Sequence, residues 1–563
     1  MSDSATGPLR IPSYRAIWIT AMLSNVGSFL QAVAGAWLMK ELTDSSGIWV
    51  ALMVSSNLLP LLFLSLFAGV VADMFSKARV ILWSQVLMGA SATAMAVTTY
   101  LDVVTPGLLL TLGLTLGVGM AFNLPAWQSL VPDLVPRGMV ASAVALNSAG
   151  FNIARAVGPA LGGLILTVWG PAAAFGLNAL SYLGLIAVVA TLSRTLHRQG
   201  DEHASMGLVV NSLALSVRYA RYAPTLRRVL TLVALFGVTT AVIQAVLPNR
   251  TTQLGGGEAV YGILLGAMGM GALIGAFGRT RSHATRTGRS LPYSIAVFGI
   301  AGILTGIVTN VAVAFVCMVI IGSCWILTLT VLNATTQLMT PDWIRGRVMS
   351  LYLLAFTGIM PLGSISAGAL ADRIGAGQAM VVFSSCTLLL GLATPRFRIP
   401  PLDRVRIPQY EEERVRFRHP DEEGGPVLVA NTWQLTPETL DEFLTLMRRV
   451  RLIRLRNGAY AWRLYRNTEH PYRLTEVYLF TSWDEHLAQR QRADDDAIAH
   501  FRRARQLDEE HGQLNSHYIA VDLDHPPDWS TLVSHPSDAD DHTRDHREPP
   551  SGDRATAEHG PPD

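Results

Sequence analysis

Apolar runs of about 20 residues recur between residues 16 and 394, and they constrain this chain more than any other feature. The hydrocarbon core of a bilayer is about 30 Å thick, so a helix needs about 20 apolar residues to cross it. Half of all residues are hydrophobic, only 15% are charged, and mean hydropathy is +0.32. Such values are typical of an integral membrane protein. We expect an all-α membrane protein with twelve transmembrane helices, near residues 16–39, 48–72, 80–100, 107–130, 139–168, 172–192, 229–248, 259–278, 291–310, 312–333, 347–370 and 376–394.

Charge divides the chain into two parts. Residues 1–398 hold 23 Lys and Arg against 11 Asp and Glu, a net charge of +12, whereas residues 399–563 have a net charge of −10. This asymmetry excludes a single soluble enzyme, a nucleic-acid binder driven by net charge and a disordered chain. The expected parts are a cytoplasmic N-terminus (1–15), a first six-helix half (16–192), a cytoplasmic linker (193–228), a second six-helix half (229–394), a linker (395–426), a small α+β cytoplasmic domain (427–525) and a disordered tail (526–563).

Positive charges fall almost entirely on one side of the expected spans. With a cytoplasmic N-terminus, nineteen Lys and Arg lie on the inner side and only Lys40, Arg250 and Arg373 on the outer side. Loops rich in Lys and Arg stay in the cytoplasm. We therefore expect a multi-pass protein of a bacterial cytoplasmic (inner) membrane with both termini cytoplasmic. The first apolar run should remain as a span, because Met1–Arg10 has no signal-peptide cleavage pattern.

The two expected halves resemble each other. Residues 128–133, after span four, are echoed by residues 337–342, after span ten. The spacing of three glycines in the first half is repeated in the second: Gly158, Gly163 and Gly170 match Gly363, Gly368 and Gly375. Two homologous six-helix halves joined by a cytoplasmic linker are the arrangement of an alternating-access transporter.

The segment after span two, residues 69–79, combines a glycine, an acid and two cations at a helix junction. The carboxylate of Asp73 is suited to accept hydrogen bonds from the N-terminal amides of a neighbouring helix. Lys77 and Arg79 are suited to pair with acids of the other half when the inner side is closed. Gly69, Asp73, Lys77 and Arg79 are therefore a candidate gating loop, with ordinary positive-inside anchoring as the alternative.

Span five carries small residues and the most unusual charge of the sequence. Gly158, Pro159, Gly162 and Gly163 favour close helix packing. Arg155 is a charged residue near the middle of a span, where an uncompensated Arg costs at least about 2.5–3.5 kcal/mol. It should therefore contact an anionic group or oxygen of a substrate, organise a cavity, or tether helices through Asn or carbonyl groups.

Other polar residues in the expected spans are candidates for lining a midplane cavity. With Arg155, the candidates for the substrate cavity are Asn152, Asn147, Asn25, Gln31, Asn178, Gln244 and Gln337. For each Asn or Gln taken singly, a helix–helix hydrogen bond is the alternative. The eleven acids before residue 399 all lie at span ends or in loops, so coupling through Asp73, Asp133, Glu258 or the substrate itself stays open.

These motifs carry a resemblance to the major facilitator superfamily. Residues 69–79 resemble its loop motif, although Met74 and Ser76 stand where that motif has a cation and a glycine. Residues 154–163 resemble its fifth-helix antiporter motif, with Ala154 in place of the leading glycine. Across residues 9–398 the chain is similar to the exporter branch that includes the enterobactin exporter and related secretion proteins; further residues that carry this likeness are Asn25, Gly27, 41–46 and 123–128. The resemblance implies a secondary transporter that exports small amphipathic molecules of drug or siderophore type, coupled to protons.

From Val427 onward the pattern changes to alternating strands and amphipathic helices. We expect strands at 427–434, 459–465, 473–481 and 516–521, and helices at 437–456 and 486–510. This β-α-β-β-α-β order is ferredoxin-like. It resembles the dimeric α/β-barrel domains grouped with antibiotic-biosynthesis monooxygenases, which implies a homodimer through this domain.

The C-terminal domain offers candidate pocket residues but no catalytic pattern. The candidates are Trp462, Tyr465, Glu476, Trp483 and His486, and neither a nucleophile–base pair nor metal-ligand spacing accompanies them. Aromatic residues on a sheet face usually pack against helices. We therefore expect a dimerisation or regulatory module.

The sequence thus predicts a transporter rather than an enzyme, with the lipid bilayer and a small-molecule substrate as its partners. No Walker A pattern is present, which argues against ATP as the energy source. No cofactor, metal site, catalytic residue or nucleic-acid partner is expected. The alternatives are a dedicated siderophore or lipid transporter, or a membrane-tethered sensor or oxidase whose C-terminal domain carries the activity.

Overall fold

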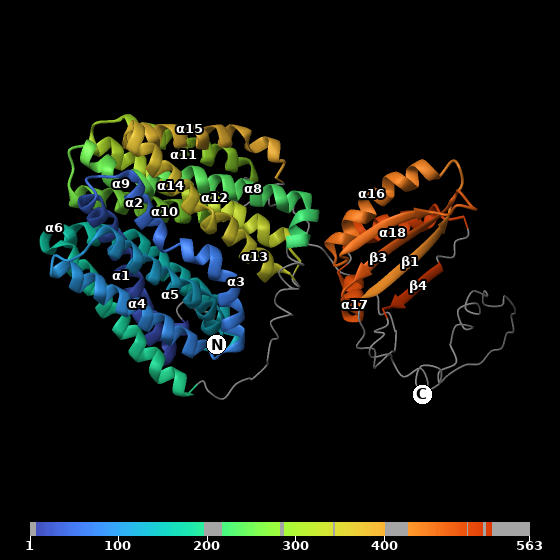
Figure 1. Ribbon diagram of the computed structural model, residues 1–563, viewed down its shortest axis with the longest axis horizontal. Coiled ribbons are helices and arrows are strands. Elements are labelled where there is room, and N and C mark those ends of the chain that lie inside the picture. Colours follow the sequence, from blue (N-terminus) through green and yellow to red (C-terminus); the bar gives the residue numbers. More distant parts are fainter. Residues whose placement is uncertain are drawn as a thin grey trace, which may run out of the picture. The chain divides into compact units, whose positions relative to one another are not determined.

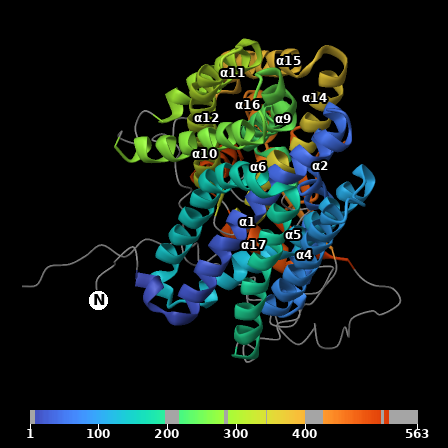
Figure 2. The ribbon, with the colours of Figure 1, turned by 90° about the vertical axis from the view of Figure 1, so that its left-hand side faces the viewer.

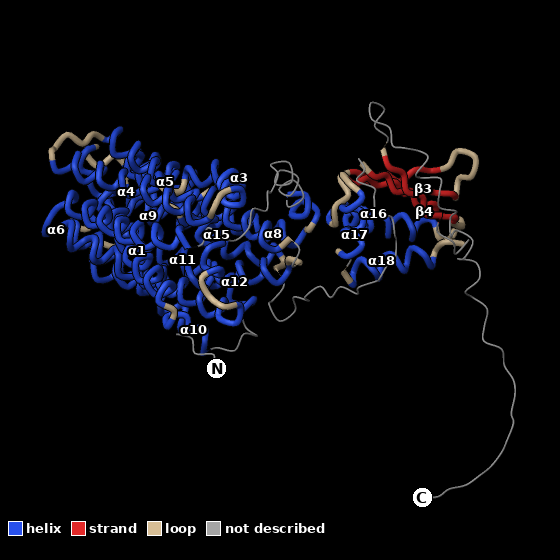
Figure 3. Tube along the Cα trace, turned by 90° about the horizontal axis from the view of Figure 1, so that it is seen from below, coloured by secondary structure: helices blue, strands red, loops and turns tan. Residues whose placement is uncertain are grey.

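The computed structural model describes residues 7–195, 217–281, 287–341, 344–399, 426–492, 494–509 and 514–520 (Figure 1). Much of the expected linkers and all of the expected tail lie outside these residues. The contacts of the described residues group them into two compact units, and the second unit holds the four strands and α17. Among the described residues, strands occur only in the C-terminal part of the chain, and the first part is helical (Figure 3).

The membrane part consists of two sets of helices. The first set comprises η1 (Gly7–Arg10), α1 (Pro12–Leu42), α2 (Gly47–Ser56), α3 (Leu59–Met74), α4 (Lys77–Tyr100), α5 (Pro106–Asp133), η2 (Arg137–Met139) and α6 (Val140–Thr195). The second set comprises α8 (Pro224–Thr240), α9 (Val242–Gln253), α10 (Glu258–Arg281), α11 (Thr287–Ile307), α12 (Val311–Met339), α13 (Arg345–Leu353), η4 (Leu354–Gly358), α14 (Met360–Ile374), α15 (Ala376–Ala393) and η5 (Thr394–Phe397).

Ten of the described helices are long and apolar enough to cross a membrane by length and composition, against the twelve spans expected. The expected fifth and sixth spans run together in α6, and the expected second span is divided between α2 and α3 at Asn57 and Leu58. The expected eleventh span is also not one regular helix, because a π-helical turn, η4, separates α13 from α14. Such turns insert one residue and locally widen a helix.

Two glycines with positive φ make the sharp turns between consecutive spans. Gly170, at φ 77°, interrupts α6, and Gly375, at φ 90°, separates α14 from α15. Residues with a Cβ rarely adopt this conformation. The two glycines occupy matching positions in the two halves, so the repeat seen in the sequence corresponds to a repeated turn.

Helices of the first half contact helices of the second half in two main pairs. The first part of α6 lies against α10, and α2 lies against α14 (Figure 2). The bundle end that holds residues 43–47, 254–257 and 375 is called the outer end, after the orientation expected from the charges. Neighbouring contacts at this end include Asn249 Nδ2, which donates to the Ser45 carbonyl at 2.6 Å.

The second half has an aromatic core. Phe236 (α8), Phe298 (α11), Trp325 (α12) and Phe356 (η4) form successive ring contacts with centroids 5.6–6.1 Å apart. Three of these four residues come from different long helices, so the cluster holds the second half together around its centre. Aromatic pairs at this spacing contribute beyond their buried area.

The C-terminal part contains β1 (Val427–Gln434), α16 (Leu440–Arg456), β2 (Ala461–Arg466), β3 (Arg473–Phe480), α17 (Trp483–Gln491), α18 (Asp495–Gln506) and β4 (Leu514–Ile519). The element order agrees with the sequence expectation, and the second expected helix is divided into α17 and α18. The strands form an antiparallel sheet in the order β2-β3-β1-β4. Val427, Val429, Tyr478 and Phe480 make the apolar core of one sheet face.

Helices α16 and α18 are joined by charged pairs. Arg456 Nη2 lies 2.8 Å from Asp494 Oδ2, and Arg503 Nη2 lies 2.6 Å from Glu442 Oε1. The guanidinium of Arg454 lies over the ring of Phe501, 4.2 Å from its centroid. These contacts connect the two helices through their side chains.

The turn at Gly170 provides a test of this fold. A Cβ at residue 170 would have open space around it, so the cost of Gly170→Ala should come from the left-handed backbone alone, about 1–2 kcal/mol. We expect a lower unfolding temperature for the purified protein, measured by loss of monodisperse protein on heating.

Gly176→Ala is the matched control, because Gly176 is helical and also has open space beside it. We expect this variant to be as stable as the wild type or slightly more so, since Ala favours a helix over Gly. Equal unfolding temperatures for the two variants would contradict the turn geometry.

Candidate functional site

Arg155 lies at the centre of the first part of α6. Fifteen residues separate it from Val140 at the start of the helix, and fifteen separate it from the turn at Gly170. At 1.5 Å per residue, the Arg155 backbone is about 22 Å from either end. The structure therefore places this charge at mid-span, as the sequence predicts.

The surroundings of the Arg155 side chain are aromatic. Its guanidinium lies over the ring of Phe151, 5.2 Å from the centroid, and Phe151 contacts Phe29 of α1 with ring centroids 5.6 Å apart. The side chain is half-buried, and within the described residues it has no hydrogen-bond or ion-pair partner. A cation–π contact offsets only part of the cost of removing a guanidinium from water. The proposed tether to Asn or carbonyl groups is thus absent among these residues.

The guanidinium of Arg250, a buried residue, differs from that of Arg155 because its donors have partners. Arg250 Nε donates to the Thr305 carbonyl at 3.0 Å, Nη2 donates to the Val308 carbonyl, and Nη1 donates to Gln253 Oε1 at 3.1 Å. Arg250 therefore ties α9 to the end of α11, where the carbonyl groups of a helix are short of partners. It is a structural residue with its donors occupied.

The small residues of α6 bring three helices to backbone contact beside Arg155. A Cβ on Gly158 would lie 2.7 Å from Phe29 Cβ, and one on Gly162 would lie 3.1 Å from Leu30 Cα, both in α1. A Cβ on Gly163 would lie 2.6 Å from Gly262 Cα in α10, and the Pro159 carbonyl faces Gly262 as well. The antiporter-type motif Gly158, Pro159, Gly162 and Gly163 therefore lies where α6 packs between α1 of its own half and α10 of the second half.

Two of the candidate cavity residues bond to each other. Asn178 Nδ2 of α6 donates to Gln31 Oε1 of α1 at 2.5 Å, and Gln31 Nε2 lies 3.3 Å from Met95 Sδ of α4. Both side chains are buried. A Cβ on Gly27 would lie 2.4 Å from Asn178 Oδ1, so that glycine makes room for the pair. In this structure Gln31 and Asn178 join helices instead of facing a cavity.

The other candidates are dispersed. Asn147 Oδ1 accepts a hydrogen bond from Trp127 Nε1 at 3.3 Å, which joins α6 to α5. Asn152 and Gln337 bond within their own helices, to the Ser148 carbonyl at 2.9 Å and to Asn333 Oδ1 at 2.6 Å. Asn25 and Gln244 are half-buried. The structure therefore does not gather the eight candidates into one polar cluster.

The candidate gating loop makes its described contact within its own half. Lys77 Nζ lies 2.7 Å from Asp133 Oδ2 at the end of α5. The surroundings of Gly69 and the side chain of Asp73 in α3 lie outside the described part of the chain. Arg79, near the start of α4, is exposed. Lys77 thus pairs with an acid of the first half, where the sequence suggested an acid of the other half.

Contacts at the outer end join the two halves, and sequence reasoning missed them. Trp37 of α1 stacks on Tyr261 of α10 with centroids 5.7 Å apart, and Lys40 Nζ lies 3.9 Å from the centroid of the Trp37 ring. Trp37 Nε1 also donates to Glu41 Oε1 at 2.7 Å. The interfacial position of Trp37 near Lys40 was a usable signal, because Trp favours membrane interfaces, but its partner on another helix was not readable from the sequence.

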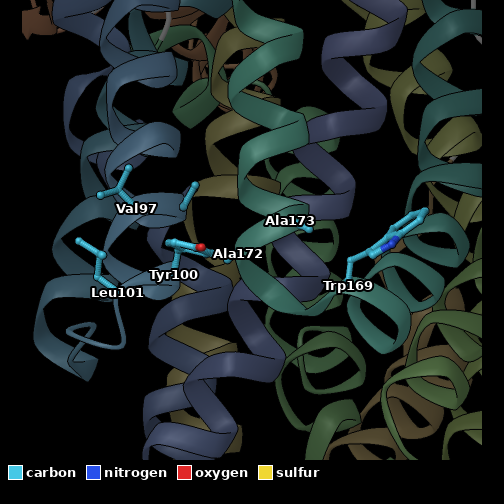
Figure 4. Close-up of a pocket in the computed structure, with 7 residues that line it drawn as sticks. Val97, Tyr100, Leu101, Trp169, Ala172 and Ala173 are labelled. Carbon is cyan, nitrogen blue, oxygen red and sulfur yellow. The ribbon is translucent and has the colours of Figure 1, made fainter.

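An apolar hollow of about 550 Å³ lies at the outer end of α4 and the turn of α6, away from Arg155 (Figure 4). Tyr100 and Trp169 border it with exposed rings, beside Val97 and Leu101. Aromatic side chains with one polar atom favour the level of the lipid headgroups. This hollow contains none of the predicted cavity residues.

Comparison with known proteins identifies the family. A model of the transmembrane secretion effectors matches residues 3–521. The chain belongs to this family. It is 25% identical over 409 residues to the multidrug efflux pump Tap of Mycolicibacterium fortuitum, covering 71% of this chain and 98% of that protein. It is also 25% identical over 380 residues to the staphyloferrin A transporter of Staphylococcus aureus, covering 66% and 92% of the two chains.

Further relatives agree with this assignment. The enterobactin exporter EntS of Citrobacter koseri is 24% identical over 404 residues, covering 69% of this chain and 94% of that protein. Among solved structures, an inward-facing bacterial homologue of the human lysosomal transporter Spinster has a TM-score of 0.53 at 14% identity, covering 70% of this chain and 98% of that one. These comparisons confirm the predicted major facilitator fold. They also confirm the predicted function of a secondary transporter that exports small molecules.

In the C-terminal domain of this exporter, two of the predicted pocket residues meet. Glu476 is fully buried, and its carboxylate accepts from Asn431 Nδ2 at 2.8 Å and from Trp462 Nε1 at 2.9 Å. Trp483 and His486 form a separate ring cluster with His517, in which the two histidine rings are 4.8 Å apart. Tyr465 is 55% exposed and belongs to neither group.

The buried carboxylate generates a testable expectation about stability. In Glu476→Leu, the donors of Asn431 and Trp462 lose their acceptor inside the sheet core, which costs about 1–3 kcal/mol for each buried group left unsatisfied. We expect faster amide hydrogen exchange in peptides from β1 and β3 of the full-length protein, measured by mass spectrometry.

Two further variants serve as an intermediate case and as a control for that measurement. Glu476→Gln keeps one acceptor oxygen and should lie between the wild type and Glu476→Leu. Glu469→Gln removes an acid from the exposed turn between β2 and β3 and should leave exchange unchanged. Wild-type protection in Glu476→Leu would show that the hydrogen bonds are not needed to hold the sheet.

Proposed function

We propose that this exporter moves anionic amphipathic molecules of drug or siderophore type out of the cytoplasm in exchange for protons, and that Arg155 holds the anionic group. One observation supports this above the others: a mid-span guanidinium without a hydrogen-bond or ion-pair partner among the described residues. A charge at this depth is stable only with a partner or with water. A carboxylate or catecholate of the substrate supplies that partner during part of the cycle.

The position of Arg155 favours a role in alternating access. Its backbone lies at the contact of α6 with α10, because a Cβ on Gly269 of α10 would lie 2.9 Å from the Arg155 carbonyl oxygen. Helix α10 belongs to the second half, so an anion bound at Arg155 lies next to the surface along which the halves move. Binding sites at the interface of two repeats are the rule in such transporters.

For the placement in the cell, we propose the cytoplasmic membrane of a bacterium with both termini inside. The support is the distribution of nineteen inner against three outer Lys and Arg residues. In this orientation the substrate enters from the end of the bundle that holds Lys77 and Asp133. The C-terminal domain then lies in the cytoplasm.

Proton release from acid-loaded inverted vesicles tests the proposal. Catechol and hydroxycarboxylate siderophores and a set of amphipathic cations would be added in turn to vesicles with wild type, Arg155→Gln or no exporter. Losing a charge-assisted contact should raise the apparent KM for anions about 10–100-fold, because hydrogen bonds to charged groups contribute about 1.5–3 kcal/mol. Arg155→Lys, which keeps the charge but not the planar fork, should fall between these values.

Two controls show whether a change in KM is specific to Arg155 and whether transport is coupled to protons. Arg373→Gln removes an exposed outer cation and should leave the KM unchanged. Direct uptake of labelled siderophore into the same vesicles separates transport from proton coupling. Equal KM values for wild type and Arg155→Gln would assign Arg155 to the structure, and uptake without proton release would exclude the proton as the coupling ion.

For the C-terminal domain we propose a homodimer contact and no enzymatic role. The sheet face opposite the buried core carries an apolar row that crosses all four strands, since Leu479 pairs with both Ala461 and Leu428, and Leu428 pairs with Tyr518. Tyr518 is 56% exposed. The carboxylate of Glu476 is occupied by two donors, which disfavours it as a base. A variant lacking residues 411–563 should retain transport.

The apolar row gives a prediction about the oligomeric state of the protein, measured as the mass of the particle in solution. Leu479→Arg places a charge in the centre of the row and should convert a dimer into a monomer, read by light scattering on the purified protein in detergent. Glu469→Arg adds the same residue in the exposed turn and should leave the mass unchanged. A wild-type protein that is monomeric at all concentrations would contradict the homodimer.

A further inference from the structure

A carboxylate from one half of the bundle lies at the start of a helix from the other half. Asp372 near the end of α14 accepts three hydrogen bonds: Oδ1 from the Gly47 amide at 2.5 Å, and Oδ2 from the Ile48 amide at 3.1 Å and from Ser46 Oγ at 3.3 Å. The first amides of a helix lack partners within it, and the helix dipole favours an anion there. Ser46, at the N-cap of α2, makes no capping bond of its own. Asp372 therefore caps α2 from across the interface.

The backbones beside this cap are in direct contact. A Cβ on Gly368 would lie 2.4 Å from the Gly47 carbonyl oxygen, and one on Gly47 would lie 2.6 Å from the Gly368 carbonyl oxygen. In the preceding loop, Asp44 and Ser45 have φ of 50° and 68°, a region that residues with a Cβ rarely adopt. Asn249 of the second half binds the Ser45 carbonyl. The second half thus holds both the loop and the start of α2.

The sequence around Asp372 repeats that of the candidate gating loop. Helix α3 ends with Gly69-Val-Val-Ala-Asp73, and α14 ends with Gly368-Ala-Leu-Ala-Asp372. In both, a glycine precedes the acid by four residues near the end of a membrane helix. The first copy lies at the inner end of span two and the second at the outer end of span eleven, so the two copies mark opposite ends of the interface.

The cap is specific to α14. Counting from the matched glycines, the residue of α6 that corresponds to Asp372 is Thr167, whose hydroxyl donates to the Gly163 carbonyl of its own helix at 2.8 Å. The repeat of the two halves therefore does not by itself explain an acid at residue 372.

We propose that Asp372 is the latch of the outer gate. Its carboxylate holds the start of α2 against α14 while the outer side is shut, and the three hydrogen bonds break when the halves part at that end. The state described by this structure is the outer-closed one, with the Gly47–Gly368 and Gly163–Gly262 contacts formed at the same end. Asp372 is a positioning residue and does not contact the substrate.

Distances between spin labels on the full-length protein in lipid nanodiscs test the latch. Labels at Val103 and Thr309, both exposed at the outer end of different halves, report its opening once Cys317, Cys324 and Cys386 are replaced by Ser. Asp372→Ala should raise the ratio of long to short distances at least about tenfold, because three hydrogen bonds to a charged group are lost. Asp372→Asn keeps one acceptor oxygen and should give an intermediate ratio.

Asp44→Asn is the matched control, because it removes an exposed acid from the loop before α2 and should leave the ratio at the wild-type value. If Asp372→Ala fails to fold, Asp372→Asn, which has nearly the same volume, decides the question. A wild-type ratio in a folded Asp372 variant, or an equal shift in Asp44→Asn, would overturn the latch. The measurement uses no substrate, so its result is independent of the role proposed for Arg155.

Discussion

Close contact between bare helix backbones is the interaction on which the arrangement of the two halves depends. Apolar surface gains little by leaving lipid for protein, so helices in a bilayer associate through packing and hydrogen bonds. Here α6 meets α10 at Gly163 and Gly262, and α2 meets α14 at Gly47 and Gly368. Gly163 and Gly368 occupy matching positions in the two halves. The same small-residue contact is thus used twice, once on each side of the interface between the halves.

The polar groups inside the bundle fall into two kinds, and the difference follows from the cost of burying them. Gln31 with Asn178 and Arg250 with carbonyl groups of α11 are satisfied within the protein and therefore fix helices in place. Arg155 instead lies on an aromatic ring, at mid-span and at the contact between the halves. A protein gains nothing in stability from such a charge. This is the reason for the role in the transport cycle that we propose for Arg155.

The polar residues of the sequence were a good guide to position and a poor guide to partners. Arg155 lies at mid-span as predicted, since the length of an apolar run fixes the depth of each residue. The eight candidate cavity residues do not form one cluster, because the direction of a side chain depends on the rotation of its helix against its neighbours. In the C-terminal domain, likewise, the sequence marked Glu476 as a candidate pocket residue, but did not show that Asn431 and Trp462 would donate hydrogen bonds to its carboxylate.

The sequence by itself determined the class of the protein, the approximate spans, the repeat of two halves and the strand order along the C-terminal domain. These features depend on local composition and on the spacing of apolar residues, because a bilayer requires apolar segments of a certain length and a half-buried strand requires alternation. Only the tertiary structure decided that α6 would run through two spans with one bend, that Lys77 would pair within its own half, and that Asp372 would cap α2. The physical reason is that each of these contacts joins groups on separate helices, whose relative rotation and depth are set by packing of the whole bundle.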